Sequence, residues 1–118
     1  PTGKMPTLFT PRDGPVFRFA GLWSTWADDA GTLVYTSTIL TTKANQTMAP
    51  FHHRMPVLLT EDGAEAWLER DTTAPDDLQP LFCSAPNDAI ALRPVSKRVN
   101  HVRHDDPGCW NPATNDEW

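Results

Sequence analysis

The chain has 118 residues, of which 39% are hydrophobic and 21% charged, and its formal net charge is −5. This length and composition fit one small globular domain and exclude a disordered chain. The negative charge argues against a generally basic nucleic-acid surface, although it is compatible with a local positive groove. No apolar run approaches the roughly 18 residues that cross a bilayer, so we expect no membrane partner.

The first half of the chain predicts short antiparallel strands. Residues 7–10 (TLFT) and 16–20 (VFRFA) are β-rich runs separated by PRDGP, and an Asp-Gly between such runs predicts a hairpin. The segment ADDAG (27–31) predicts a second turn. Residues 33–42 (LVYTSTILTT) are dense in β-branched and aromatic residues and form the strongest predicted strand.

The middle of the chain predicts a strand followed by a helix. Residues 55–59 (MPVLL) read as a strand, with Pro56 at its beginning or at a sheet edge. Thr60 is a suitable N-cap for a helix over residues 60–70, because acidic side chains follow it in the first turn. Three side chains are expected on the buried side of this helix: Ala66, Trp67 and Leu68.

The last third predicts a short helix over residues 75–81, a final strand over 88–96 and a polar, turn-rich tail. Several short strands with a few helices indicate an α+β fold of mainly antiparallel strands. Two cysteines, Cys83 and Cys109, are too few for a disulfide framework and favour a reducing cytoplasm. The sequence leaves a pairing between these two cysteines open.

The stretch MAPFHHRMPVLL (48–59) places titratable side chains directly before an apolar run. Histidine can act as a general acid or base near neutral pH. His52 and His53 would face opposite ways on an extended segment, so Arg54 would project on the same side as His52. The competing interpretation is a buried, satisfied histidine and a surface ion-pair partner, and residue statistics alone favour that interpretation.

Two other groups of side chains suggest further chemistry. His101, His104 and Cys109, with Cys83 farther off, suggest zinc, but their spacing matches no standard zinc pattern and surface residues are the simpler account. We therefore expect no metal and no cofactor. Tryptophan can stack on unpaired bases, although it is more often a core residue. The five tryptophans are Trp23, Trp26, Trp67, Trp110 and Trp118.

Five segments together resemble a known family. They are GKMP (3–6), FRFAGLW (17–23), TILTTKAN (38–45), MAPFHHRMPVLL (48–59) and PVSKRVNHVRHDDP (94–107). Their order and separation resemble the C-terminal half of the SRAP domain, from the SOS response-associated peptidase family of abasic-site processing proteins. The resemblance implies that residues 1–118 are the C-terminal portion of a single SRAP domain, with a partly open barrel of short strands.

The resemblance also implies a function. In the family, an N-terminal cysteine attacks the ring-opened aldehyde of an abasic site in single-stranded DNA and forms a DNA–protein crosslink, and the protein removes its own initiator methionine. That cysteine, together with an asparagine and a glutamate, belongs to the half that precedes this chain. Neither Cys83 nor Cys109 can replace it, because neither carries a free α-amine. The preceding half of the domain is therefore an expected partner.

Three residues of this chain match functional positions of the family. His52 matches the catalytic histidine and Arg54 a phosphate-binding arginine, while Lys4 is expected as a second DNA-binding residue. His53 stands where an aspartate is common, which puts any orienting role of that acid in doubt. Two other hypotheses are open: a non-catalytic half-domain that binds single-stranded DNA or a protein, and a zinc-binding structural domain.

Overall fold

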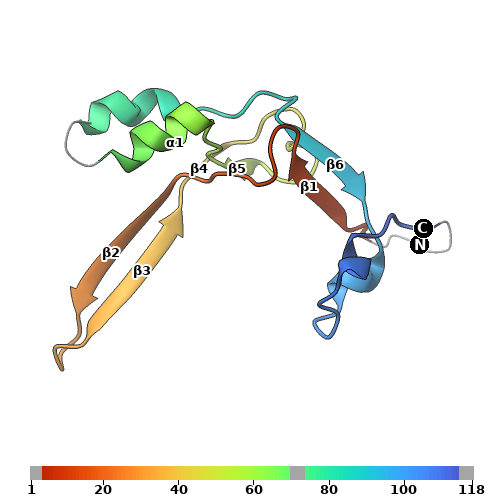
Figure 1. Cartoon of the computed structure of the whole chain (residues 1–118), viewed down its shortest axis with the longest axis horizontal. Coiled ribbons are helices and arrows are strands. Elements are labelled where there is room, and N and C mark those ends of the chain that lie inside the picture. The colour runs from red at the N-terminus through yellow and green to blue at the C-terminus, as the bar shows by residue number, and fades with distance from the viewer. Residues whose placement is uncertain (1–3, 70–73, 115–118) are drawn as a thin grey trace. The chain divides into compact units, whose positions relative to one another are not determined.

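The computed structural model describes residues 4–69 and 74–114 of the chain. They divide into two compact units, of which unit 1 draws on Pro1–Pro15 and Ile90–Trp118 and unit 2 on Val16–Ala89. The strands pair antiparallel in small, open two-stranded sheets, accompanied by one α-helix and short 3-10 helices in the described part (Figure 1). The predicted α+β class is therefore confirmed.

Unit 1 is built on one pair of strands. Strand β1 (Thr7–Pro11) pairs antiparallel with β6 (Ile90–Pro94), with Thr7 opposite Pro94 and Pro11 opposite Ile90. Both strands lie within or next to the predicted segments, 7–10 and 88–96. Ile90 is 3% exposed, because it faces the small core of this unit.

The predicted hairpin across PRDGP is wrong, because β1 pairs with β6. Pro11 and Pro15 flank the turn and have no N–H to donate across a hairpin. Residues 16–20 approach the segment after β5 (Arg54–Pro56) instead: Phe19 forms a bridge with Leu58, and the carbonyl of Arg18 accepts a hydrogen bond from the backbone N–H of Leu59 at 2.8 Å.

The tail of unit 1 is rich in turns, as the sequence predicted, and it also contains two 3-10 helices, which the sequence did not predict. Helix η2 (Lys97–Asn100) follows Ser96, and η3 (Pro107–Trp110) follows Asp106, and each of these two residues caps its helix with its side chain. A backbone hydrogen bond of 2.9 Å from the N–H of Ser96 to the carbonyl of Asn111 closes the tail on itself.

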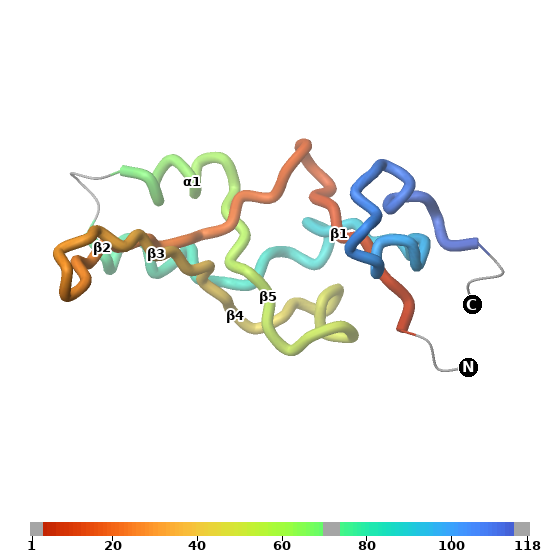
Figure 2. Tube along the Cα trace, turned by 90° about the horizontal axis from the view of Figure 1, so that it is seen from below, coloured from red at the N-terminus to blue at the C-terminus, as the bar shows by residue number. Residues whose placement is uncertain are grey.

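Unit 2 begins with the hairpin of β2 (Gly21–Ala27) and β3 (Leu33–Ile39), which run side by side in both views (Figures 1 and 2). The predicted ADDAG turn is confirmed. Asp28 closes it, because one carboxylate oxygen accepts hydrogen bonds from the N–H groups of Ala30 and Thr32 at 2.9 and 2.8 Å. Gly31 has φ +81°, a conformation that favours glycine.

The predicted strand over 33–42 is interrupted at Leu40. Strand β3 ends just before this residue, and β4 (Thr41–Lys43) begins just after it. Leu40 donates to the carbonyl of Ala20 and accepts from the N–H of Val57, both at 2.9 Å, and Ala20 donates to the carbonyl of Val57 at 3.0 Å. Three chain segments meet at this point. Ala20 and Val57 are at most 1% exposed, so this junction is the core of unit 2.

Strand β5 (Arg54–Pro56) pairs antiparallel with β4, with Lys43 opposite Arg54 and Thr41 opposite Pro56. The predicted strand over 55–59 is therefore shorter and begins one residue earlier. Between the two strands, residues 46–51 form a turn. His52 directly follows this turn, and Arg54 is the first residue of β5.

Helix α1 (Glu61–Leu68) follows as predicted, with the Thr60 hydroxyl accepting from the N–H of Gly63 at 3.1 Å. The predicted buried side is largely wrong: Trp67 is partly buried, but Ala66 is exposed and Leu68 is 75% exposed, and the buried residue of the helix is Gly63. Residues four apart share a helix face, so the face of Gly63 and Trp67 turns Leu68 outward. Arg70, the predicted helix end, lies outside the described residues.

The second predicted helix of unit 2 is the 3-10 helix η1 (Pro75–Phe82), which packs on α1 through an edge-on contact of Trp67 with Phe82. The ring centroids are 5.8 Å apart. In the described part of the chain, we find no helix with the length and apolar character needed to span a bilayer.

Candidate functional site

A buried asparagine anchors the turn that precedes the site. Asn45 is 8% exposed, and its side-chain amide donates to the carbonyls of Ala85 and Pro86 at 3.0 and 3.2 Å. Its carbonyl oxygen accepts from the N–H of Met48 at 2.9 Å. A buried amide with donors and acceptor satisfied is a fixed point, so the turn of residues 46–51 starts from a defined position.

His52 lies at the end of this turn with its ring exposed and folded back on the next residues. Its Nδ1 lies 3.0 Å from both the backbone N–H and the carbonyl oxygen of Arg54. A deprotonated Nδ1 can accept from that N–H, and a protonated Nδ1 can donate to that carbonyl. Both states of this nitrogen therefore have a partner, which suits a group that takes up and releases a proton.

The rings of His52 and His53 are stacked, with centroids 4.4 Å apart and an interplanar angle of 24°. The prediction that they face opposite ways is wrong. Alternation holds along a strand, and β5 begins only at Arg54, so the two histidines occupy the bend before it. The competing interpretation predicted that one of the two histidines is buried. That prediction is also wrong, since both are exposed.

The Arg54 side chain is fixed by a single residue of the neighbouring strand. Its Nε and Nη2 donate to the hydroxyl of Thr41 at 3.2 and 2.9 Å, and Nη2 also donates to the Thr41 carbonyl. The guanidinium stays exposed. A positive group that is both exposed and held in one orientation is suited to binding an anion such as a phosphate.

The structure brings His52 and Arg54 together through the backbone of Arg54, whereas the guanidinium is directed to Thr41. Lys4 is exposed and belongs to unit 1, so only His52 and Arg54 form a site within one unit. Sequence reasoning missed Thr41 and Asn45. Both lie in the segment TILTTKAN, and the pairing of β4 with β5 brings Thr41 within reach of Arg54.

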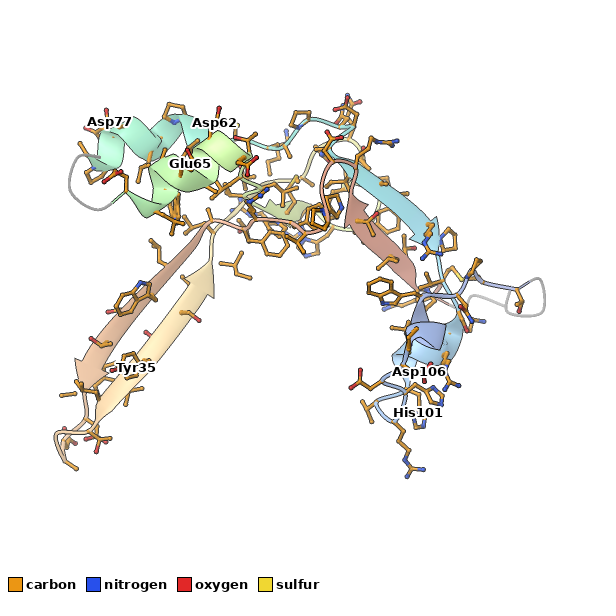
Figure 3. All side chains as sticks on the ribbon, in the orientation of Figure 1. Tyr35, Asp62, Glu65, Asp77, His101 and Asp106 are labelled. Atoms are coloured by element: carbon orange, nitrogen blue, oxygen red, sulfur yellow. The ribbon has the colours of Figure 1, made fainter. Side chains whose placement is uncertain are left out.

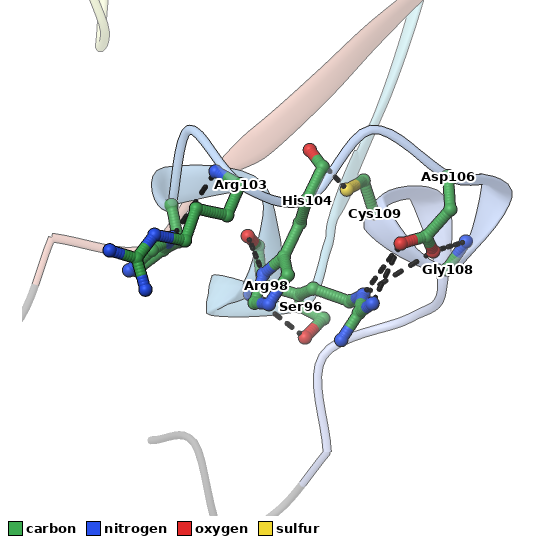
Figure 4. A network of polar contacts seen from close by, with 8 residues as sticks. Ser96, Arg98, Arg103, His104, Asp106, Gly108 and Cys109 are labelled. Carbon is green, nitrogen blue, oxygen red and sulfur yellow. Dashed lines mark hydrogen bonds and ion pairs between the residues drawn. The ribbon is translucent and has the colours of Figure 1, made fainter.

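The histidines of the tail take part in a separate polar network (Figure 4). His104 Nδ1 lies 3.0 Å from the carbonyl of Arg98, and the Cys109 thiol lies 3.6 Å from the carbonyl of His104. Arg98 contacts both carboxylate oxygens of Asp106 through Nε at 3.3 Å and one through Nη2 at 2.7 Å. These contacts link the two 3-10 helices of the tail.

The ion pair of Arg98 and Asp106 shifts the pKa of both side chains. The hydrogen bond from Arg98 lowers the pKa of the Asp106 carboxyl, and the hydrogen bond to Asp106 raises the pKa of the Arg98 guanidinium. Within residues 4–69 and 74–114, no group of three or more histidine, cysteine or acidic side chains comes together in a way that could hold a metal ion. The zinc hypothesis therefore gains no support, and the network is structural.

The three tryptophans of unit 2 do not share one face as a base-stacking surface would require. Trp67 donates from its indole nitrogen to the carbonyl of Gly21 at 3.0 Å and packs on α1 and η1. Trp23 and Trp26 are three positions apart on β2 and therefore lie on opposite faces of the hairpin. Trp110 lies in the tail of unit 1, and Trp118 falls outside the described residues.

The family model for SOS response associated peptidase (SRAP) matches residues 1–102. The chain belongs to this family. Abasic site processing protein YoqW of Bacillus subtilis is similar to this SRAP chain, with 37% identity over 107 residues, 91% of this chain and 48% of YoqW. Abasic site processing protein HMCES of Gallus gallus is 39% identical over 95 residues, which are 79% of this chain and 28% of HMCES.

Two solved structures share the fold of this SRAP chain. A protein from Bacteroides thetaiotaomicron superposes with a TM-score of 0.83 at 24% identity, covering 96% of this chain and 50% of that protein. A protein from Bordetella bronchiseptica superposes with a TM-score of 0.67 at 28% identity, covering 78% and 46%. The chain spans about half the length of the YoqW relative and of both solved structures.

Proposed function

We propose that this chain supplies the histidine and arginine side of an abasic-site processing protein that captures single-stranded DNA as a covalent crosslink. The observation that carries the proposal is the geometry of residues 52–54 in a chain of the SRAP family. His52 has a backbone partner for Nδ1 in either protonation state, and Arg54 presents an exposed guanidinium held by Thr41.

The proposed chemistry divides between two segments. A cysteine with a free α-amine and a thiol condenses with the aldehyde of the opened sugar, closes a thiazolidine ring and releases water. Neither cysteine of this chain, Cys83 or Cys109, is N-terminal. Because the chain spans about half the length of YoqW, we assign the nucleophile, its asparagine and glutamate, and the removal of the initiator methionine to a part of the complete protein outside these 118 residues.

Within this division, His52 relays a proton to or from the opened sugar, and Arg54 binds a flanking phosphate. Phosphate contacts position the strand without reading its sequence, so we expect recognition of the lesion and not of the surrounding bases. Lys4 is proposed as a further DNA contact, from unit 1. We further propose that the protein processes this DNA in the cytoplasm of a bacterial cell.

The exposed apolar side chains of the β2–β3 hairpin support the proposal that another half of the same domain binds this chain. Along one face, Trp23, Leu33, Tyr35 and Ile39 share the same side of the antiparallel register and are 53–72% exposed. Leu22 and Trp26 lie on the other face and are 53% and 55% exposed. A two-stranded ribbon with apolar side chains on both faces is suited to cover by further strands.

The test is covalent trapping by the complete protein, with the preceding segment included. Single-stranded DNA with one abasic site should give a band that survives denaturing gel electrophoresis, and an intact strand of the same sequence should give none. His52→Ala should slow formation or reversal of this band by about 100-fold, as expected for loss of a general acid or base. Trapping at an unchanged rate in that variant would remove His52 from the mechanism.

A non-catalytic binding module is the second candidate, and the exposed guanidinium of Arg54, held by Thr41, favours it. It predicts reversible binding of intact single strands by the chain itself. Arg54→Ala should weaken this binding and lower the salt dependence by about one phosphate contact. Equal affinity and equal salt dependence of the variant and the wild type would exclude Arg54 as a phosphate contact.

A further inference from the structure

The turn of residues 46–51 is held by side-chain hydrogen bonds to a segment about forty residues away in the sequence. The Asn87 side-chain carbonyl accepts from the backbone N–H of Gln46 at 2.9 Å, and its amide donates to the Gln46 side chain at 3.1 Å. The backbone carbonyl of Asn87 accepts from the hydroxyl of Thr47 at 2.6 Å. Asn87 therefore clasps the first two residues of the turn.

The end of the same turn sets the position of His52. The backbone N–H of His52 donates to the carbonyl of Met48 at 3.1 Å, so the backbone of the histidine is fixed to the turn. The Arg54 guanidinium is fixed by Thr41, on a strand outside the turn. A displacement of the turn would therefore move the imidazole while leaving the guanidinium in place.

We propose that Asn87 is a positioning residue for His52: its clasp on Gln46 and Thr47 fixes the turn that places the imidazole against the backbone of Arg54. The inference rests on the proposed function of His52 for its consequence in catalysis. Asn87 is exposed and acts at a distance from the ring, so its effect is on geometry and not on the reacting atoms. Small displacements of a reacting group cost rate steeply.

Two variants of Asn87 separate the parts of the clasp. Asn87→Ala removes both side-chain hydrogen bonds to Gln46. Asn87→Asp keeps an oxygen that can accept from the Gln46 N–H and loses only the donor to the Gln46 side chain. The matched control is Asn100→Ala, at an exposed asparagine that ends η2 in unit 1.

The first measurement is amide hydrogen exchange in the 118-residue chain. The Arg54 N–H donates to His52 Nδ1, whereas the Ala44 N–H donates to the backbone carbonyl of His53 at 3.0 Å. In Asn87→Ala, we expect exchange at Arg54 to rise about tenfold and exchange at Ala44 to stay unchanged. Asn87→Asp should give a smaller rise. Unchanged exchange at Arg54 in Asn87→Ala would overturn the proposal.

The second measurement is the rate of abasic-site trapping by the complete protein at saturating DNA. We expect Asn87→Ala to lower this rate about tenfold while affinity for intact DNA, which depends on Arg54, keeps its wild-type value. Asn87→Asp should recover part of the rate, and Asn100→Ala should match the wild type. A variant with wild-type rate would overturn the catalytic consequence, as would an equal loss of rate and affinity.

The two measurements also keep this inference apart from the proposed function. If the wild-type complete protein forms no crosslink, the proposed function fails, and the exchange at Arg54 still decides whether Asn87 positions His52. If the wild type forms the crosslink and exchange at Arg54 does not respond to Asn87→Ala, the proposed function stands and the clasp is refuted.

Discussion

The segment around His52 and the β2–β3 hairpin are both exposed parts of unit 2, but they are held in different ways. Asn45, Thr41 and Asn87 fix the first with side-chain hydrogen bonds. The hairpin is held chiefly by backbone pairing and carries apolar side chains on both faces. Figure 3 shows Tyr35 on this hairpin, away from the helices that carry Asp62, Glu65 and Asp77.

The difference distinguishes two kinds of exposure. Exposed polar groups that are each fixed by a specific partner are organised for binding from solution, because their orientation is set before a ligand arrives. Exposed apolar side chains with no such constraint are organised for burial against other protein. On this basis, we propose that the first region is a binding site and the second a protein interface.

The largest expected effect comes from breaking the anchor of the first region. Asn45→Ala removes three side-chain hydrogen bonds in a buried position, taking the amide donor from the carbonyl of Ala85 and the acceptor from the N–H of Met48, while the carbonyl of Pro86 keeps the N–H of Ala89. We expect a loss of about 2–3 kcal/mol in the free energy of unfolding. Urea denaturation should show a lower midpoint with an unchanged slope.

The exposed Asn100→Ala serves as the control for this variant and should stay within about 0.5 kcal/mol of the wild type. If Asn45→Ala were as stable as this control, the turn would not depend on its buried amide, and the contrast with the hairpin would disappear.

Substitutions on the exposed face of the hairpin should change self-association and leave the free energy of unfolding nearly unchanged. Replacing both Trp23 and Tyr35 by threonine keeps strand propensity and removes two exposed aromatic rings from one face. We expect less self-association in sedimentation velocity, with the free energy of unfolding changed by less than about 1 kcal/mol. A fall of more than about 2 kcal/mol would indicate that the rings are already packed in this chain.

Val102→Thr is the matched control for the hairpin variant. Val102 is 97% exposed in the tail of unit 1, outside the hairpin, and a single exposed apolar residue is ordinary. We expect its replacement to leave both association and stability unchanged. Equal loss of association in this control would show that the hairpin face has no special role.

The smallest effect concerns the ion pair of Arg98 and Asp106, which tests how much exposed side-chain bonds contribute to stability. Because the pKa of Asp106 is lowered in the folded chain, its contribution is present above the unfolded value of 3.8 and is lost as pH falls through the folded value. The raised pKa of Arg98 adds no pH dependence in this range.

Asp106→Asn keeps an oxygen for the N–H of Gly108, which Asp106 caps at 2.8 Å, and removes the charge. Thermal unfolding of both proteins between about pH 2 and 6 should show the wild type slightly more stable near pH 6 and the difference vanishing toward pH 2. A difference that stays constant over this range would assign the effect to something other than the ionised carboxylate.

Local signals in the sequence predicted local structure. Thr60 and the acidic residues after it predict α1, and Asp28 with Gly31 predicts the hairpin turn, because in each case the partners lie within four residues. The failures are non-local. Nothing in VFRFA indicates that residues 18–20 approach the segment after β5, and β1 lies opposite a strand about eighty residues later.

The candidate site divides in the same way. His52 and Arg54 were identified from the motif, but the orientation of each depends on groups that the motif does not specify. Thr41 reaches Arg54 across the pairing of β4 with β5, and the bend before β5 stacks the two histidine rings. A residue list can therefore come from sequence, whereas the direction of each side chain requires the fold.

Leu40 joins the two regions compared above. Its N–H and carbonyl connect Ala20, at the foot of the hairpin, to Val57, just beyond the strand that begins with Arg54. Leu40 is thus the one residue between the end of β3 and Thr41, which accepts hydrogen bonds from the guanidinium. A protein segment that docked on the hairpin and changed its twist would therefore shift the orientation of that guanidinium, so covering the hairpin and placing the arginine would not be independent events.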